Sequence, residues 1–496
     1  MINYFLSKSQ YLRGIQCHKS LWLLKNREHL RKEISISEKI NFEEGRQIET
    51  LAQKLFPDGV KIEYEASSLN EKITETKSLI DSGIETIYEA TFQYDNVLVM
   101  VDILHKVNNG WELYEIKSST EPKEDHKDDI AVQLYVLKGC GVALNKINLI
   151  HINKQYERNG DLDLKQLFSI VDLTSETLQK QEEVKENLVL MRNDLGNESP
   201  KIDIGLHCIK PYECDFKDYC WSHIPDNSIF NLSRLENRKR FDLYSRGIVN
   251  LQELPEGYNL TPFQQAQVRA ECQGKNTINK KALRKFINKE IRFPIYFLDF
   301  ETTQQTIPPF NGLRPNTAYP FQYSLHYLEH NSSELKHKEF LAKAGVDPRK
   351  EIVERLIQDI PTDVCVLAYN AGFEKGKIKL LADQFPEYNS QLMNIYDHIV
   401  DLMIPFQKGI IYKKEQKGSY SIKHVLPAFL DNNSELSYES LKITNGLEAS
   451  NTFLKLHLIK DADEVENKRK ELLTYCKLDT HAMVKLLKKI IELVDQ

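Results

Sequence analysis

The sequence predicts two α/β units joined by a short helical segment. Its 496 residues are about three times the ~150 residues of an average domain, so more than one domain is expected. Runs of β-branched and apolar residues occur in two separate stretches, which begin at Glu85 and at Pro294. Residues 225–290 lie between them, contain no such run, and are interpreted as a small helical connector. The expected domains are therefore 1–224, 225–290 and 291–496.

Composition and charge narrow the class of protein. Hydrophobic residues make up 41% and charged residues 28% of the chain, which is typical of folded domains with buried cores. The formal net charge of -6 excludes a global positive field that would draw the chain to nucleic acid or an acidic membrane. The N-terminus has no apolar signal-peptide region, and apolar stretches such as Phe293–Phe300 are far shorter than the ~20 residues of a membrane span. We expect a cytoplasmic protein with no membrane partner, in which any contact with a polyanion is local.

The first unit is expected to begin with helices and continue as a sheet. Apolar residues at three-to-four spacing predict helices within residues 1–60, and Pro57-Asp58-Gly59 ends the second of them. The runs IETIYEATFQY, NVLVMVDILHKV and WELYEIKSS predict strands, and Asn108-Asn109-Gly110 between the last two indicates a hairpin. The remaining elements of this unit are a helix over 128–137, a strand in KINLIHINK and a long helix over 174–192.

The second unit opens with the strand IYFLDFET and continues with the strand-like runs FQYSLHYL and DVCVLAYN and a final helix over 464–494. The connector before it is rich in basic residues. These residues are Lys275, Lys280, Lys281, Arg284, Lys285, Lys289 and Arg292. They are interpreted as a solvated helix face, with a patch that faces nucleic acid as the alternative.

Three charged residues of the predicted hairpin belong on one face. A turn at Asn108-Asn109 sets Asp102 opposite Glu115, whereas a turn at Asn109-Gly110 sets Asp102 opposite Lys117. Side chains alternate with a period of two, so both registers leave the three residues on one face. Carboxylates among apolar residues need a counter-charge, and a magnesium-dependent hydrolase would use them as ligands while the lysine steadies the phosphate charge. The alternative is a cross-strand salt bridge on a solvated face.

The segments GRQIETLA, VDIL, YEIKSS and IAVQLYVL resemble, in this order, the motifs of RecB-like PD-(D/E)XK nucleases. The resemblance implies a restriction-endonuclease-like fold in the first unit. It also implies metal ligands at Asp102, Glu115 and the Ile116 carbonyl, a catalytic Lys117, and Gln133 beside the site. The family often has a histidine four residues after the helix glycine, and here that position is Glu49, which can still bind a hard cation. The aromatic residue expected four positions after the glutamine is replaced by Leu137.

Four cysteines form a second candidate site. Cys208, Cys214 and Cys220 are each separated by five residues, and Cys17 lies far upstream in GIQCHKSLW. Four thiolates can saturate a zinc ion or an iron-sulfur cluster, and gaps wider than those of zinc knuckles favour the cluster. The arrangement resembles the iron-sulfur RecB-like nucleases, which include the CRISPR adaptation exonuclease and the AddB-type repair nucleases. The resemblance implies a [4Fe-4S] cluster that clasps the ends of the first domain, with zinc as the alternative.

The other cysteines are expected in the core. They are Cys140, Cys272, Cys365 and Cys476.

The third candidate site lies in the second unit. Asp299 and Glu301 share one face of a buried strand, and Tyr475 and Asp479 share one face of a helix. Either pair alone would also suit a structural ion pair or a cap, but AYNAGFEKGKI lies between them and contains Glu374.

The order of these motifs resembles DnaQ-like exonucleases of the ribonuclease H-like fold, in the subgroup with a tyrosine in the third motif. The resemblance implies two metal ions held by Asp299, Glu301, Glu374 and Asp479, with Tyr475 orienting the attacking water. The family's usual acid at the second motif is aspartate, and here it is Glu374. Asp401 and His481 are candidate auxiliary groups, and Asn370 is expected to support the second motif.

FPIYFLDFETT, GSYSIKHVLPAF and YCKLDTHAM extend the resemblance to a bacterial family that fuses the two nuclease domains. We therefore expect a nuclease dependent on Mg²⁺ or Mn²⁺, with two centres, that cuts DNA or RNA from an end. Repair, defence against mobile elements and RNA turnover all stay open as roles. Local basic patches would attract the polymer, at 275–292 and at Lys413, Lys414, Lys417 and Lys423. The alternative is a nucleic-acid-binding or assembly protein in which one or both nuclease folds are inactive.

Overall fold

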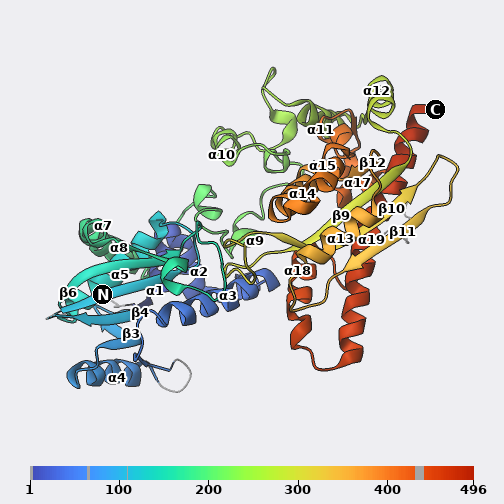
Figure 1. Ribbon diagram of the computed structural model, residues 1–496. Coiled ribbons are helices and arrows are strands. Elements are labelled where there is room, and N and C mark those ends of the chain that lie inside the picture. The colour runs from blue at the N-terminus through green and yellow to red at the C-terminus, as the bar shows by residue number, and fades with distance from the viewer. Residues whose placement is uncertain (1–3, 64–67, 109, 431–440, 496) are drawn as a thin grey trace. The chain divides into compact units, whose positions relative to one another are not determined.

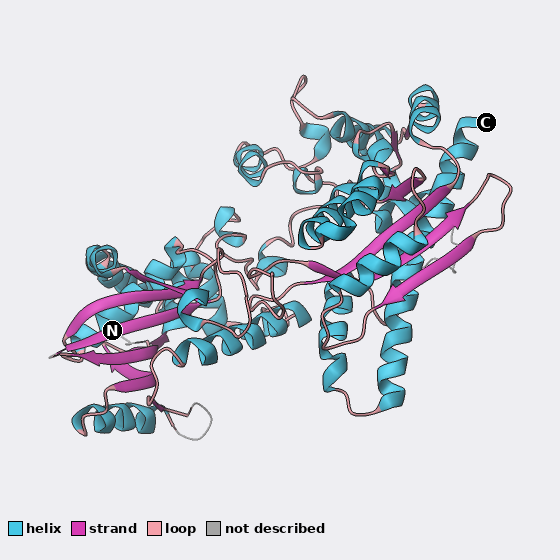
Figure 2. Cartoon of the chain, in the orientation of Figure 1, coloured by secondary structure: helices cyan, strands magenta, loops and turns pink. Residues whose placement is uncertain are grey.

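The computed structural model describes residues 4–63, 68–108, 110–430 and 441–495 and is a mixed α/β protein (Figures 1 and 2). The chain divides into two compact units: the first is Met1–His223 with Thr306–Asn316, and the second is Ile224–Gln305 with Thr317–Gln496. The segment expected as a connector therefore belongs to the second unit. Within the described ranges, no helix is both long enough and apolar enough to cross a membrane.

The first unit contains a mixed seven-stranded sheet. Its strands are β1 (Leu6–Ser7), β2 (Val60–Lys61), β3 (Thr86–Tyr94), β4 (Val97–Val107), β5 (Gly110–Lys117), β6 (Leu144–Ile152) and β7 (Phe168–Asp172). They lie in the order β2-β3-β4-β5-β6-β7, and β1 pairs with β4. The strands β3, β4 and β5 form an antiparallel meander, and β6 is parallel to β5.

Val107 pairs with Gly110 in the β4–β5 hairpin. This is the register expected for a turn at Asn108-Asn109, of which Asn109 lies outside the described residues. Ile103 pairs with Tyr114, so the next position of the same register sets Asp102 opposite Glu115.

Helices cover both faces of this sheet. They are α1 (Lys8–Gln16), α2 (His18–Asn26), α3 (Ile36–Gln53), α4 (Leu69–Asp81), α5 (Glu124–Gly139), α6 (Leu164–Leu167), α7 (Thr174–Gln179), α8 (Gln181–Leu195) and α9 (Lys217–Cys220). One core contains Ile130 of α5 and Leu113 of β5, and the other contains Ile48 of α3 and Tyr114 of β5. Alternate residues of β5 therefore enter opposite cores, as a period of two requires.

The single long helix predicted over 174–192 is wrong, because the chain forms α7 and α8 with a break at Lys180. The Lys180 ammonium pairs with Asp128 at 2.8 Å, and the Gln181 amide donates to the Thr177 carbonyl at 2.9 Å. The Gln181 amide therefore satisfies the Thr177 carbonyl, which would accept a backbone N–H in a continuous helix.

The second unit is built on a five-stranded sheet in the order β11-β10-β9-β12-β13. The strands are β9 (Ile295–Thr303), β10 (Tyr319–Leu328), β11 (Lys336–Leu341), β12 (Cys365–Ala368) and β13 (Ile399–Asp401). The strands β9, β10 and β11 are antiparallel, and β12 runs parallel to both β9 and β13. A separate pair, β8 (Thr277–Ile278) with β14 (Ile411–Tyr412), adds a short strand to the segment expected to be wholly helical.

The helices of this unit are α10 (Asn237–Ser245), α11 (Pro262–Gln273), α12 (Lys280–Glu290), α13 (Arg349–Asp359), α14 (Ala371–Gln384), α15 (Asn389–Asp397), α16 (Ile404–Gln407), α17 (Ile422–Phe429), α18 (Gly446–Lys455) and α19 (Ala462–Asp495). Leu298 and Phe300 of β9 enter one core with α13 and α14. Ile295 and Phe297 enter another core with α11, α12 and α19. The odd-numbered residues of β9 therefore point to the side that α19 covers, where Asp299 and Glu301 follow in the same alternation.

We predict that Gly409→Ala destabilises the second unit. Gly409 has a φ of +64°, and an added Cβ would lie 2.7 Å from the Pro262 carbonyl oxygen and 2.9 Å from Phe263 backbone atoms. Strain and overlap together should lower the free energy of unfolding by about 2–4 kcal/mol in urea titrations. The control is Gly376→Ala, whose Cβ on α14 meets nothing within 4 Å. That change should instead stabilise by about 0.5–1 kcal/mol, and equal effects of the two changes would contradict the packing described.

Candidate metal centres

In the first unit, two lysines and two acids form a ring of ion pairs at the end of β5. The Lys117 Nζ atom lies 2.7 Å from Glu115 Oε1 and 2.6 Å from Asp129 Oδ2. The Lys8 Nζ atom lies 2.9 Å from Glu115 Oε1 and 3.0 Å from Asp129 Oδ1. The Gln133 amide donates to Glu115 at 2.7 Å and to Asp129 at 3.1 Å. Because both acids are buried, this ring compensates charges that water does not reach.

Three more carboxylates meet beside this ring. One oxygen atom from each of Glu49, Glu89 and Asp102 lies within 4.8 Å of the others. The other contact of Asp102 is with the sheet, since its Oδ2 accepts the Ile116 backbone N–H at 2.7 Å. Glu89 faces Asp102 across the β3–β4 ladder and has a φ of +58°, which is rare for a residue with a side chain.

Burial and mutual repulsion disfavour ionisation of Asp102 and Glu89 in the absence of a cation. Burial, followed by the nearby Glu115 carboxylate, raises the pKa of Asp102. Burial and a hydrogen bond with Glu49 raise the pKa of Glu89 to about 9. The carboxylates of Asp129 and Glu115 outweigh burial at Lys117 and raise its pKa, so this lysine stays protonated. Three carboxylate oxygens, two of them from acids that are costly to ionise, fit a hard divalent cation.

The structure brings together all five first-unit residues singled out from the sequence. They are Glu49, Asp102, Glu115, Lys117 and Gln133. The sequence did not indicate Lys8, Glu89 or Asp129 as members of this site. Asp129 could have been found, because it precedes Gln133 by four residues and therefore shares its face of α5. Lys8 carries no such signal, since it is distant in sequence from every partner.

In the second unit, the predicted acids line one cavity of about 410 Å³. β9 contributes Asp299 and Glu301, α14 contributes Glu374, and α19 contributes Tyr475 and Asp479. The acids are largely buried, and Glu374 is 2% exposed. Its Oε2 atom has no hydrogen-bond partner among the described residues.

The electrostatics of this cavity resemble those of the first centre. Burial and the Asp479 carboxylate raise the pKa of Glu301 to about 8. Burial, followed by repulsion from the Asp401 carboxylate, raises the pKa of Glu374 to about 8. Burial followed by Asp479 also raises the pKa of Asp299. A partnerless buried oxygen and acids held towards the neutral form fit sites for divalent ions.

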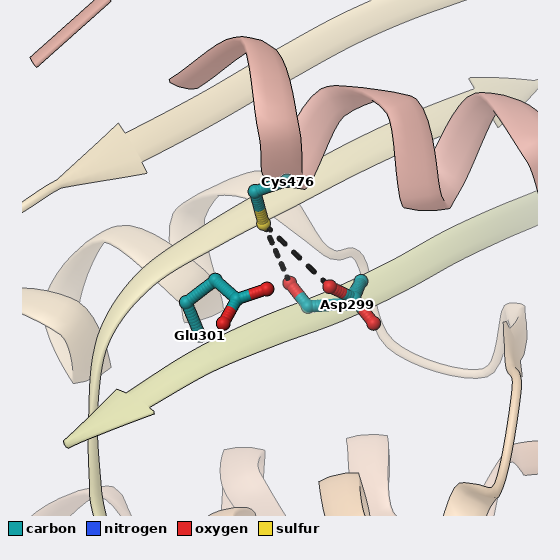
Figure 3. A group of neighbouring side chains, drawn as sticks. All are labelled: Asp299, Glu301 and Cys476. Atoms are coloured by element: carbon teal, nitrogen blue, oxygen red, sulfur yellow. Dashed lines mark hydrogen bonds between the residues drawn. The ribbon is translucent and has the colours of Figure 1, made fainter. Parts of the chain in front are cut away.

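Two residues that the sequence did not assign to this centre contact residues that line its cavity. Figure 3 shows the Cys476 thiol directed at Asp299, with Sγ 3.6 Å from Oδ2 and 3.7 Å from the carbonyl oxygen. Cys476 was expected to be a core residue, and it is buried, but against acids. The Lys423 Nζ atom lies 3.3 Å from the Tyr475 hydroxyl. The sequence indicated Lys423 only as part of a basic patch.

Of the three residues expected to assist the second centre, Asn370 lines the cavity, Asp401 contacts Asn370, and His481 lies elsewhere. Asp401 accepts the backbone N–H of Asn370 at 3.1 Å and so fixes the start of α14. Asn370 lines the cavity and has a φ of +71°. Within the described part of the chain, His481 is not among the residues that line the cavity, and its ring stacks against His326 with centroids 5.5 Å apart.

The four cysteines predicted to act together line a single cavity of about 20 Å³. They are Cys17, Cys208, Cys214 and Cys220. Burial raises the pKa of Cys17 and of Cys220. The four sulfur ligands of a tetrahedral zinc ion lie about 3.8 Å apart. All four cysteines belong to the described residues, and no three of their sulfur atoms lie within 4.8 Å of one another. Four thiol ligands gathered around one cavity are a donor set that fits an iron-sulfur cluster or a zinc ion. Cys140, expected in the core, is exposed because it follows the last turn of α5.

Comparisons with known proteins cover parts of the chain. A family model described as a domain of unknown function (DUF2779) matches residues 296–421, which include Asp299, Glu301 and Glu374. "Uncharacterized protein MG366" of Mycoplasma genitalium is 28% identical over 236 residues, which cover 44% of this chain and 34% of that protein. Its homologue in Mycoplasma pneumoniae is 29% identical over 206 residues, covering 38% and 31%. "Uncharacterized protein UU173" of Ureaplasma parvum is 27% identical over 224 residues, covering 41% and 32%. The chain thus spans about a third of the length of these relatives.

We predict that stability in the absence of divalent ions falls as pH rises. Glu301 and Glu374 have pKa values of about 8 in the folded state and 4.5 as the ordinary value. Between these values the folded state binds more protons than the unfolded state, so each group lowers the free energy of unfolding by up to about 1.4 kcal/mol per pH unit. Urea unfolding in chelator at pH 5 to 8 measures this slope.

The Glu301→Gln and Glu374→Gln variants should each show a shallower slope, because glutamine does not titrate. Glu387→Gln, at an exposed position of the same unit, serves as the control and should keep the wild-type slope. Parallel slopes in all variants would contradict the burial of these acids in one cavity.

Proposed function

We propose that this chain is a metal-dependent nuclease that hydrolyses phosphodiester bonds of DNA, with RNA as the alternative polymer, and that it contains two centres. The observation that carries the proposal is the convergence, in each unit, of acids from separate segments into one buried set. Carboxylate oxygens suit Mg²⁺ or Mn²⁺. In the second unit, a mixed sheet with acids at the end of its central strand agrees with the ribonuclease H-like fold suggested by the motifs.

In the second centre, Asp299, Glu301, Glu374 and Asp479 would hold two divalent ions. These ions would supply an activated water and stabilise the leaving 3′ oxygen. Tyr475 would orient the water, and the Lys423 ammonium, 3.3 Å from its hydroxyl, holds that hydroxyl in one direction. A cavity of about 410 Å³ agrees with a site that admits one nucleotide at a time, as an exonuclease requires.

In the first centre, Glu49, Glu89 and Asp102 are the ligand set that the geometry favours. Both oxygens of Glu115 already accept from Lys8, at 2.9 and 3.0 Å, so Glu115 must turn away from Lys8 before it can bind an ion. Lys117 is 26% exposed and held protonated by its acidic neighbours, so its one remaining N–H donor can stabilise charge on a phosphate oxygen.

We predict that Lys117→Ala and Asp299→Ala each slow cleavage by ~10²–10³-fold in the centre to which the residue belongs, because the first removes a positive charge that stabilises the transition state and the second removes a metal ligand. The measurement is degradation of end-labelled single- and double-stranded DNA and RNA with Mg²⁺ or Mn²⁺, with and without chelator. If only one centre turns over substrate, only one of the two variants will be slow.

Matched controls are Lys146→Ala on the same sheet as Lys117 and Asp397→Ala in the same unit as Asp299, both exposed. Their rates should equal the wild-type rate. Intact binding of nucleic acid without any chelator-sensitive cleavage would instead support the alternative, a binding or assembly protein.

We further propose that the four cysteines bind a [4Fe-4S] cluster that clasps the first unit. Cys17 caps the C-terminus of α1, whereas the other three lie near the C-terminal end of the unit, at 208–220, so one cluster would join the two ends of its sequence. Asp215, between two of the cysteines, also pairs with Arg13 of α1 at 2.5 Å and so strengthens the same closure.

Anaerobic purification should yield a brown protein with about four iron and four sulfide ions per chain, because four thiolates complete the coordination of such a cluster. Cys214→Ser should lose most of this iron, whereas the exposed Cys140→Ser should keep it. A colourless wild-type protein that contains zinc would contradict the assignment.

A further inference from the structure

The Cys476 thiol is a potential ligand that the proposed hydrolysis does not use. Ligand atoms of Asp299, Glu301 and Cys476 all lie within 4.8 Å of one another, although the residues come from β9 and α19 (Figure 3). Cys476 is 0% exposed, so the sulfur faces the acids and no water. A buried cysteine is ordinarily surrounded by apolar atoms, and here its nearest polar atoms belong to Asp299.

The spacing suits a tetrahedral ion. A metal–sulfur distance of about 2.3 Å and a metal–oxygen distance of about 2.1 Å set the two ligand atoms about 3.6 Å apart. The observed distance from Cys476 Sγ to Asp299 Oδ2 is 3.6 Å. These two side chains could therefore bind one ion with little movement, and a Glu301 oxygen is close enough to add a third ligand.

An independent observation also points to a ligand in the cavity that Asp299 and Glu301 line. Glu374 reaches it from α14, is 2% exposed, and leaves its Oε2 atom without a hydrogen-bond partner among the described residues. A buried carboxylate oxygen with no partner is costly, and an ion in the cavity would supply one.

We propose that Cys476 is a metal ligand, and that it makes the second centre prefer thiophilic divalent ions, Zn²⁺ or Cd²⁺, over Mg²⁺. Mg²⁺ favours oxygen ligands and would leave the thiol protonated, whereas a softer ion binds the thiolate. On binding, the S–H bond breaks, a metal–sulfur bond forms and the proton leaves to solvent, with no change of oxidation state. This inference deepens the proposed function, since a thiophilic ion in this position would displace the ions used for hydrolysis and inhibit the centre.

The test is a titration of the metal-stripped full chain with Cd²⁺, followed by the ultraviolet absorption of the cadmium–thiolate bond. The four other clustered cysteines also bind Cd²⁺, so the result is the difference between variants. Cys476→Ser should lose one tight equivalent, and its ratio of Cd²⁺ to Mn²⁺ affinity at this centre should fall by at least about tenfold. Asp299→Asn should lose the same equivalent, which keeps the test decisive if Cys476→Ser folds poorly.

The control is Cys365→Ser, which removes another buried cysteine of the same unit whose sulfur contacts the Glu290 carbonyl and no acid. It should keep every tight equivalent. Equal Cd²⁺ binding by wild type, Cys476→Ser and Asp299→Asn would overturn the inference.

The binding test separates this inference from the proposed function. If nucleic acid is never cleaved but one Cd²⁺ equivalent depends on Cys476, the nuclease proposal fails and the metal ligand stands. If Asp299→Ala slows cleavage but Cys476→Ser binds as much Cd²⁺ as the wild type, the nuclease proposal stands and the thiol is not a metal ligand.

Discussion

The interaction on which both centres depend is repulsion between carboxylates that the sheets force into a small buried volume. On β9 the alternation that buries Phe297 also directs Asp299 and Glu301 inward. Two like charges 4–5 Å apart repel by about 3–4 kcal/mol at an effective dielectric constant near 20. Neither unit can keep all of these acids ionised without lysines or metal ions, and in their absence some of the acids must be protonated.

The two units meet this constraint in different ways. In the first unit, Lys8 and Lys117 neutralise Glu115 and Asp129. The neighbouring carboxylates of Glu49, Glu89 and Asp102 form the group that could hold a metal ion. In the second, Lys423 acts on Glu301 and Lys377 acts on Glu374, yet the pKa values of both acids stay raised. The second cavity therefore also favours divalent ions, and a cysteine sulfur lies beside two of its acids.

Patterns local to one element could be predicted from the sequence, and contacts between distant elements could not. Alternation along β9 placed Asp299 and Glu301 on one face, and alternation along the hairpin placed Asp102, Glu115 and Lys117 on one face in both registers left open by the sequence. Only the strand pairing decides that Asp102 lies opposite Glu115. Glu89 has the same alternation as any solvated strand residue, and only its position opposite Asp102 gives it a role. Cys476 has the helical spacing of a core residue, so the sequence predicted apolar neighbours for it. Its contact with Asp299 depends on how α19 packs against β9, which the spacing does not reveal.

The departures from the family motifs are accommodated by local structure. Glu374 is one methylene longer than the usual aspartate, but it lies in the first turn of α14, whose start is tied to Asp401 through Asn370. The unpaired N–H groups at a helix start favour negative charge, which suits a carboxylate that must ionise to bind an ion. Glu49 similarly comes within reach of Asp102 from α3. Glu374 in place of aspartate and Glu49 in place of histidine therefore both lie with the carboxylates of their centres, so neither difference gives a structural reason against metal binding there.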